Sequence, residues 1–507
     1  MADLELVAHT IIKAPSVAVT RPFADEPQRV RWVSCLVATA VITATVAALS
    51  NSILQDPDNW WHVRVGLDML SSRTFPTIDS YSYTFAGHPW IAKEWLGQVL
   101  LALAYGAGDW NGVALLTIAA IALTSFLLAW QLSLELKPTL ALGLTVVLAF
   151  LVGSNFNARP FIFTFPIIIV WTAQLFRAAR HERAPPLWLL APLCLWANLH
   201  AAFTFGFIIA FFAGLDLLER TRLSKPGLLV KWIGFGLLCP LVTLLNPYGV
   251  KAILATFTVA YGNEAVPYIG EWQPFNAAEN PVGEAALLIV MFGLLVSRLR
   301  IGWAKALFFV VTLHLFFTHI RFMYLFFLLV PVILAADIAQ QYPALSARKW
   351  ASEPRDRLEQ FFAQYFNQAW AGIAVVLVLV AVNLIVASQV MPSKETSASG
   401  ALDYAKEHNL SGNLLNSYDF GGTLIFHGFK TYLDGRTDQL FLDGFMKRDR
   451  ETMRSSGKPG LEALLKEYSV SWALLLPDDG RVPFFDEMTN WRKAYADDYA
   501  VIYQRGE

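Results

Sequence analysis

Eleven segments of this chain are apolar over a length that suits a helix crossing a lipid bilayer, which takes about 17–25 residues. Backbone N–H and C=O groups find no water inside a bilayer, so such segments have to be helical. The composition agrees, because 55% of the 507 residues are hydrophobic and only 16% are charged, against about a quarter in soluble domains. We therefore predict a polytopic α-helical membrane protein of about 11 transmembrane helices. The predicted spans lie near 32–54, 110–132, 138–155, 160–177, 186–199, 202–219, 227–245, 282–298, 303–318, 321–339 and 369–390.

Basic residues are distributed unevenly between the loops that join these segments. Nineteen Lys and Arg lie before the first span or in every second loop after it, whereas the remaining loops contain six. Loops rich in Lys and Arg favour the cytoplasmic side of a membrane. We therefore expect a cytoplasmic N-terminal tail, residues 1–31, an odd number of spans, and a C-terminus on the outer side.

The first outer loop, residues 55–109, contains the apolar stretch EWLGQVLLALAYGA at 94–107. Its 14 residues are too few for a span, and counting it as one would place the later basic loops outside. We predict a helix that lies in the membrane interface.

The composition changes after the transmembrane domain, residues 32–390. Residues 391–507 are polar and contain 14 Lys and Arg. GNLLNSY and SWALLLP have the pattern of strands, SASGALDYAKEHNL and PGLEALLKEYSV the pattern of helices, and AYADDYAVIYQR that of a hairpin. We predict an extracytoplasmic α/β domain.

Charge and cysteine content exclude some functions. The net charge is −1, so no nucleic acid or other polyanion is expected as a partner. Cys35, Cys194 and Cys239 all lie in apolar runs, spaced for neither a metal nor a disulfide framework.

Polar and ionisable residues gather at the outer ends of the predicted spans and in the outer loops. Such residues are costly at a membrane unless they line a wet cavity or serve a function. We therefore expect one outward-facing pocket, roofed by the C-terminal domain. The candidate residues are Asp56, Asp58, His62, Glu94, Arg159, His200, Glu271, His319, Arg321, Asp434 and Arg436.

The sequence leaves structural interpretations open for some of these residues. Asp56-Pro57-Asp58 also suits a helix start, because Asp favours the N-cap and Pro the first turn. His62 follows Asp58 by four residues and shares its helix face, which suits a metal pair, a proton relay or a salt bridge. Arg159 has the position of a side chain that anchors in lipid headgroups.

The acidic pair in the first outer loop, the interfacial helix and the terminal α/β domain together resemble the GT-C superfamily of integral membrane glycosyltransferases. This superfamily includes protein mannosyltransferases, aminoarabinose lipid A transferases and oligosaccharyltransferase catalytic subunits. More narrowly, the chain is similar to bacterial multispanning proteins with DPDxWWHxxxG, DSYSYT and EWL near the start and GG and DGR near the end. Here these motifs are residues 56–66, 79–84, 94–96, 421–422 and 434–436.

The resemblance implies a glycosyltransferase of the bacterial cytoplasmic (inner) membrane that takes a sugar from a polyprenyl-phosphate donor on the periplasmic face. A carboxylate would remove the acceptor proton, with Asp56 as first choice and Asp58 as second. Arg159, Arg321 and Arg436 would bind the departing lipid phosphate. The other candidates would contact substrate, with Glu271 also able to replace Asp58.

Some members of the superfamily need a divalent cation and others do not. Asp56, Asp58 and His62 would hold Mg or Mn, and D-x-D is the only metal-like spacing in the chain. The cofactor therefore stays open.

One departure from the superfamily limits the choice of acceptor. The later acidic and peptide-recognition motifs of oligosaccharyltransferases have no counterpart in this sequence, so protein glycosylation is not favoured. The acceptor stays open among a glycolipid, lipid A, a polysaccharide and a protein. The alternative function is a non-catalytic protein of the same fold that binds or moves a polyprenyl-linked saccharide. A transporter is disfavoured, because the sequence shows no inverted repeat.

Overall fold

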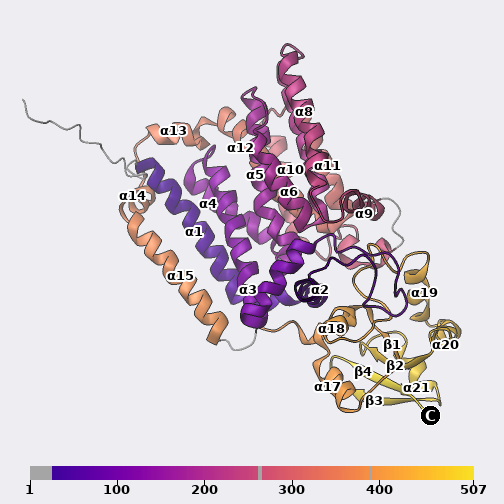
Figure 1. Ribbon diagram of the computed structural model, residues 1–507. Coiled ribbons are helices and arrows are strands. Elements are labelled where there is room, and N and C mark those ends of the chain that lie inside the picture. The colour runs from indigo at the N-terminus through magenta and orange to yellow at the C-terminus, as the bar shows by residue number, and fades with distance from the viewer. Residues whose placement is uncertain (1–25, 261–264, 387–389, 507) are drawn as a thin grey trace, which may run out of the picture.

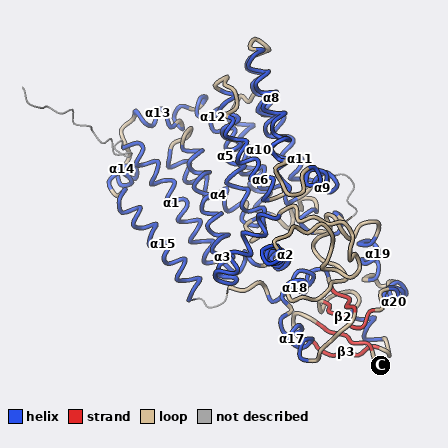
Figure 2. Tube along the Cα trace, viewed as in Figure 1, coloured by secondary structure: helices blue, strands red, loops and turns tan. Residues whose placement is uncertain are grey.

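The computed structural model describes residues 26–260, 265–386 and 390–506. Most of the predicted cytoplasmic tail, including Lys13 and Arg21, lies outside the described residues. Helices make up the larger part of the structure, and a single small sheet lies near the C-terminus (Figures 1 and 2).

The apolar helices coincide with the eleven predicted segments, which confirms a polytopic helical protein. Within the described residues, six of these helices are long and apolar enough to cross a membrane, and five are shorter. The number of membrane crossings stays a prediction. The helices of this bundle are α1 (Glu26–Ala48), α3 (Trp95–Ser133), α4 (Pro138–Leu151), α5 (Phe165–Arg180), α6 (Leu190–Leu199), α7 (Thr204–Thr221), α8 (Pro226–Thr243), α10 (Pro281–Ser297), α11 (Trp303–Thr318), α12 (Met323–Gln341) and α15 (Phe366–Val386).

Helix α3 contains a break that separates the predicted interfacial helix from the span after it. Gly108 and Asp109 have non-helical backbone angles, and Asp109 has a φ of 49°. The residues before the break correspond to the predicted 94–107 helix, and those after it to the predicted span at 110–132. The position of the first part in a membrane interface stays a prediction.

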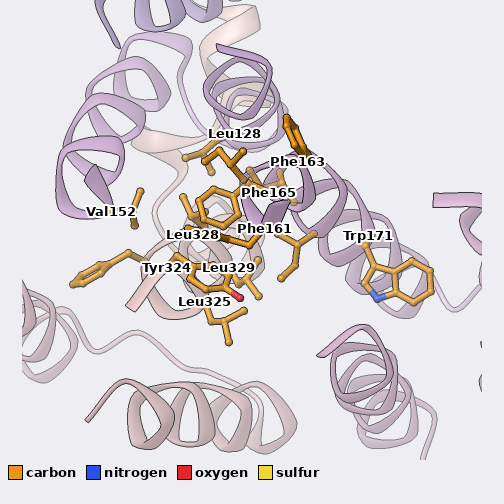
Figure 3. Packing of buried hydrophobic residues seen from close by; sticks show 14 of the residues in the cluster. Leu128, Val152, Phe161, Phe163, Phe165, Trp171, Tyr324, Leu325, Leu328 and Leu329 are labelled. Carbon is orange, nitrogen blue, oxygen red and sulfur yellow. The ribbon is translucent and has the colours of Figure 1, made fainter. Parts of the chain in front are cut away.

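Aromatic and branched side chains fill the centre of the bundle. Figure 3 shows Phe161, in the helical turn Pro160–Thr164, and Phe165, the first residue of α5, packed beside Tyr324 and Leu328 of α12. The rings of Phe165 and Tyr324 stack with centroids 4.8 Å apart. This packing fixes the N-terminal end of α5 against α12, and the polar residues described below lie just beyond that end.

The C-terminal unit has the elements that the sequence predicts. Its four-stranded sheet has the order β1-β2-β4-β3, with β1 parallel to β2 and the other neighbours antiparallel. The strands are β1 (Asn413–Asn416), β2 (Val470–Leu475), β3 (Trp491–Ala496) and β4 (Val501–Arg505). The helices are α16 (Lys394–Ser397), α17 (Ser399–Glu407), α18 (Gly421–Phe426), α19 (Phe445–Thr452), α20 (Lys458–Glu467) and α21 (Val482–Glu487).

The loop after α1 and the C-terminal unit share one hydrophobic core. Trp61 of α2 (Asp58–Ser72) and Trp90 pack in the same cluster as Leu433 and Phe441. A β-bridge between Ser82 and Thr431 adds backbone contact. The two segments, far apart in sequence, therefore form one wall at this end of the bundle.

The remaining helices lie away from this wall or beside it. The short helices α13 (Ala347–Ser352) and α14 (Arg357–Gln364) lie at the end of the bundle opposite the sheet (Figure 1). Helix α9 (Val250–Ala260) precedes the segment that contains Glu271.

Candidate active site

The Asp56-Pro57-Asp58 motif begins α2, and its carboxylates have further partners. Asp56 Oδ1 accepts a hydrogen bond from the Asp58 N–H (2.9 Å), which holds the turn that leads into α2, whereas the N-cap residue itself is Pro57 and has no capping side chain. Asp58 Oδ1 accepts a hydrogen bond from Trp61 Nε1 (2.8 Å). The Oδ2 atoms of both aspartates face the same guanidinium, so a helix start and ion pairing coexist in one motif.

That guanidinium belongs to Arg159, which contacts three carboxylates. Its Nη1 lies 3.1 Å from Asp56 Oδ2 and 3.1 Å from Glu271 Oε2, and its Nη2 lies 2.9 Å from Asp58 Oδ2. Burial alone would lower the pKa of Arg159, but the three carboxylates raise it well above its ordinary value. Arg159 therefore points into the protein as a permanent cation. The interpretation of Arg159 as a lipid-headgroup anchor is wrong.

Glu271 connects Arg159 to a second arginine. Its Oε1 lies 2.8 Å from Arg321 Nη1. The Arg321 guanidinium stacks over the indole of Trp272 at 4.3 Å. His319 contacts the backbone of the same tryptophan, with Nδ1 2.6 Å from the Trp272 oxygen. We name Asp56, Asp58, Arg159, Glu271 and Arg321 the ionic cluster.

The ionic cluster contains three carboxylates and two guanidiniums, so its formal charge is −1. Burial, helped by the charges of Asp56 and Glu271, raises the pKa of Asp58 although Arg159 and Trp61 oppose the rise. For Glu271 burial is outweighed by Arg159 and Arg321, which lower its pKa. One carboxyl that takes up a proton readily thus lies beside one that stays ionised, as acid–base chemistry requires.

Glu94, which precedes the first residue of α3, lies between two histidines. Its Oε1 is 3.1 Å from His200 Nε2 and its Oε2 is 3.8 Å from His62 Nε2. His200 Nδ1 accepts the Ala202 N–H, so in the neutral ring the proton lies on Nε2 and faces Glu94. Among the described residues Asp58 forms no pair with His62, which contacts Gln98 instead, so the predicted pairing is wrong.

Burial controls the protonation of this second group. It lowers the pKa values of His62 and His200 well below their ordinary value, with neighbouring arginines adding to the effect. It raises the pKa of Glu94 to about 7. Arg159 influences the pKa of all three groups, so His62, Glu94 and His200 adjoin the ionic cluster.

Asp434 and Arg436 form a separate, fully enclosed network. Arg436 Nη1 lies 2.6 Å from Asp79 Oδ1 and its Nη2 lies 2.7 Å from Asp434 Oδ2, and all three side chains have no exposed surface. A guanidinium that two buried carboxylates already neutralise offers nothing to a phosphate. This corrects the expectation that Asp434 and Arg436 bind substrate.

Gly435, the residue between Asp434 and Arg436, contacts the site directly. Gly435 lies so close to Asp58 that a Cβ atom would come within 1.9 Å of Asp58 Oδ1. The DGR motif is therefore a structural element that encloses Asp58.

Two residues at the site escaped the sequence analysis as functional candidates. The phenol of Tyr418 is hydrogen-bonded to Thr437, and burial together with the charge of Asp58 raises its pKa well above the ordinary value. Trp272 carries the guanidinium of Arg321 on its ring. Tyr418 lies in the sequence NSYDFGG and Trp272 in EWQP, and nothing in the spacing of these segments separates the two aromatic residues from ordinary packing.

The residues do not fit a divalent cation as they are arranged. Within the described ranges, no group of three His, Cys, Asp or Glu residues could hold a metal ion. The three carboxylates that would supply oxygen ligands surround Arg159 instead. His200 faces Glu94 with the proton of Nε2, so this nitrogen has no free lone pair for a metal.

Comparison with known proteins shows a distant structural likeness. No protein-family model matches the chain, and no curated protein matches it. The structure is similar to that of the archaeal oligosaccharyltransferase AglB from Archaeoglobus fulgidus in complex with an inhibitory peptide and a dolichol-phosphate. The identity is 12%, 94% of this chain and 74% of that chain are covered, and the TM-score is 0.49.

It is also similar to ArnT from Cupriavidus metallidurans bound to undecaprenyl phosphate. The identity is 15%, 93% of this chain and 97% of that chain are covered, and the TM-score is 0.49. Likeness at this level assigns neither a substrate nor a role to any residue, so the chemistry has to follow from the side chains.

Proposed function

We propose that this protein is a membrane glycosyltransferase that moves a sugar from a polyprenyl-phosphate donor to an acceptor on the extracytoplasmic face. The ionic cluster carries the proposal, because it places carboxylates in contact with two guanidiniums. A carboxylate serves a hydroxyl nucleophile as general base. Guanidiniums bind phosphate through two nitrogens. The apolar helices suit a donor that is anchored in the bilayer.

In the proposed reaction the acceptor hydroxyl attacks the anomeric carbon of the donor sugar. The hydroxyl proton passes to Asp58, a C–O bond forms to the acceptor oxygen, and the bond between the anomeric carbon and the phosphate oxygen breaks. The electron pair of that bond leaves with the polyprenyl phosphate. Arg321 and Arg159 stabilise the negative charge that develops there, which is the largest catalytic contribution expected of fixed charges.

Deeper burial favours Asp58 over Asp56 as the base, because their side chains are 11% and 15% exposed. This reverses the order that we expected from the sequence. Asp58 is the carboxyl whose pKa is raised by burial. Asp56 accepts a hydrogen bond from the first backbone N–H of α2 and holds Arg159. We assign to Asp56 the positioning of α2 and of the guanidinium.

Glu94 and its two histidines have the composition of a sugar-binding group. The carboxylate accepts hydrogen bonds and its side chain is 13% exposed. Both imidazoles are neutral, because burial lowers their pKa values. We propose that Glu94 accepts hydrogen bonds from hydroxyls of the transferred sugar.

The test is transfer by the purified full-length protein in lipid nanodiscs with polyprenyl-phosphate sugars. Mass spectrometry of the glycan and lipid fractions of a deletion strain identifies which sugar to use. Asp58→Asn should lower the rate by about 10²–10⁴-fold, the usual contribution of a general base. The control is Asp68→Asn, because Asp68 lies on the same helix and pairs with Arg64 at a more exposed position.

Full activity of Asp58→Asn would show that the base assignment is wrong. Binding of a polyprenyl-linked sugar without transfer by the wild-type protein would favour the non-catalytic alternative.

The orientation of the C-terminal unit relative to the membrane is tested separately with Glu462→Cys, because Glu462 is exposed on α20. A membrane-impermeant thiol reagent should label this cysteine in cells whose outer membrane has been made permeable.

A further inference from the structure

We propose that Glu271 is a resident anion in a phosphate subsite formed by Arg159 and Arg321, and that the phosphate of the donor takes its place. The inference rests on the proposed function for the identity of the ligand, a polyprenyl phosphate. In this inference Glu271 does not bind the substrate. It occupies the site that the substrate phosphate takes.

Glu271 contacts the two guanidiniums in the way that a phosphate would. One carboxylate oxygen lies 3.1 Å from Arg159 Nη1 and the other lies 2.8 Å from Arg321 Nη1. A phosphate also offers separate oxygens to two cations. The space between the two arginines is therefore shaped for an anion with two or more oxygens.

The depth of the three carboxylates shows which of them an incoming anion meets first. The side chain of Glu271 is 33% exposed, whereas those of Asp56 and Asp58 are 15% and 11% exposed. Asp56 and Asp58 hold Arg159 from the buried side. Glu271 covers the open side of both guanidiniums, whose side chains are 17% and 19% exposed.

The arginines are fixed independently of Glu271. Arg159 keeps its pairs with Asp56 and Asp58, and Arg321 lies on the ring of Trp272. Within the described part of the chain, the Glu271 carboxylate has hydrogen bonds to these two guanidiniums and to no other group. When Glu271 turns away, the guanidiniums therefore keep their positions and a phosphate can replace both ion pairs.

The charge balance requires that the phosphate replaces Glu271 and does not bind beside it. With all five groups ionised the ionic cluster has a formal charge of −1, and the charge is 0 once Asp58 has taken up a proton. In both states a phosphate added beside Glu271 would bring two anions into contact, and like charges in contact cost several kcal/mol. Without Glu271, the two aspartates and two arginines have a formal charge of 0, or +1 with Asp58 protonated, before the phosphate arrives. Glu271 stays ionised because the arginines lower its pKa, so protonation does not remove the competition.

The test compares the affinity of wild-type and Glu271→Gln proteins for geranyl phosphate, a short prenyl phosphate, by calorimetry on the full-length protein in detergent. If Glu271 fills the subsite in most molecules, only a small fraction of the wild-type protein is open to the ligand. The apparent affinity of the wild type is then lower in proportion to that fraction. Glu271→Gln should therefore bind geranyl phosphate about tenfold more tightly. Geraniol, which lacks the phosphate, should bind both proteins equally.

Control variants and probes separate the explanations. Glu279→Gln removes an exposed carboxylate from the same loop and should leave the affinity unchanged. Inorganic phosphate should bind at least about tenfold more weakly than geranyl phosphate, since it lacks the prenyl chain. Equal affinity for the two would overturn the assignment to a lipid phosphate.

Weaker or unchanged binding of geranyl phosphate by Glu271→Gln would overturn the inference while leaving the proposed function in place. If neither protein bound geranyl phosphate although both unfolded at the wild-type temperature, the proposed function itself would fail. Arg321→Gln combined with Glu271→Gln should abolish the tighter binding, because it removes one side of the subsite.

Discussion

Replacing Gly435 by alanine should displace the carboxylate of the proposed base, Asp58, although no ionisable residue is substituted. The new Cβ would lie 1.9 Å from Asp58 Oδ1, 2.9 Å from its Cγ and 3.0 Å from Trp61 Nε1. The backbone conformation of Gly435 is open to alanine, since its φ is not in the left-handed range. The effect therefore comes from the close contacts with Asp58 and Trp61 and not from backbone strain.

The size of the effect follows from these distances. An ordinary contact begins at 3.4 Å, so the Asp58 carboxylate has to move by about 1.5 Å. This movement breaks the 2.8 Å hydrogen bond from Trp61 and the 2.9 Å pair with Arg159. Overpacking costs about 1–3 kcal/mol and a lost buried hydrogen bond about 1–3 kcal/mol. A misplacement of about 1 Å lowers a rate by about 10²-fold.

The assay is the transfer reaction described above, together with thermal unfolding of the same samples. Gly460→Ala is the matched control, because Gly460 lies on α20 and the nearest atom to its Cβ is 3.9 Å away. This control should gain about 0.5–1 kcal/mol from helix propensity. If Gly435→Ala kept wild-type activity and stability, the close contact between the DGR motif and Asp58 would be refuted.

Three further predictions concern pH, the buried network and metal ions. The pKa of Glu94 is raised to about 7 from 4.5, so the folded state binds its proton more tightly and stability should fall as pH rises from about 4.5 to about 7. Glu94→Gln should remove this dependence and stabilise the protein at pH 8 by on the order of 3 kcal/mol. If the unfolding temperatures of the wild type and Glu94→Gln changed equally with pH, this prediction would be wrong. Arg436→Met leaves Asp79 and Asp434 buried without a counter-charge, which costs about 3–5 kcal/mol. The unfolding temperature and the folded yield of Arg436→Met should both fall. A yield equal to that of the wild type would show that the network of Asp79, Asp434 and Arg436 does not stabilise the fold. A chelator should leave the unfolding temperature and geranyl phosphate binding of the wild type unchanged, because Arg159 supplies the counter-charge. Stoichiometric Mn²⁺ binding with a raised unfolding temperature would disprove this.

Much of the architecture could be predicted because its causes are local. Apolar runs and bilayer thickness define the helices, and alternating polarity defines the strands of the C-terminal unit. The break at Gly108 and Asp109 follows from the same reasoning, since 94–107 was too short to be a span and had to end before the next one.

The partners of the site residues could not be predicted in the same way. Nothing in the sequence indicated that Arg159 contacts three carboxylates whereas Arg436 is enclosed by Asp79 and Asp434, because both are arginines beside turn residues. The distinction depends on contacts with distant segments. Arg159 contacts Asp56, 103 residues before it, and Glu271, 112 residues after it, whereas Asp79 lies 357 residues before Arg436. The same holds for Glu94, because its neighbour His62 lies on α2 and its neighbour His200 follows the end of α6.

The shared wall between the first loop and the C-terminal unit has a consequence for biosynthesis. Asp58 leaves the ribosome before Gly435, because Gly435 lies 377 residues later in the chain (435 − 58). A nascent chain can insert its helices and still lack the segment that encloses the carboxylate of Asp58. The protein should therefore become active only after the segment around Gly435 has reached the same side of the membrane as α2 and folded against it. A product truncated before this segment should be inactive even when all of its helices are inserted.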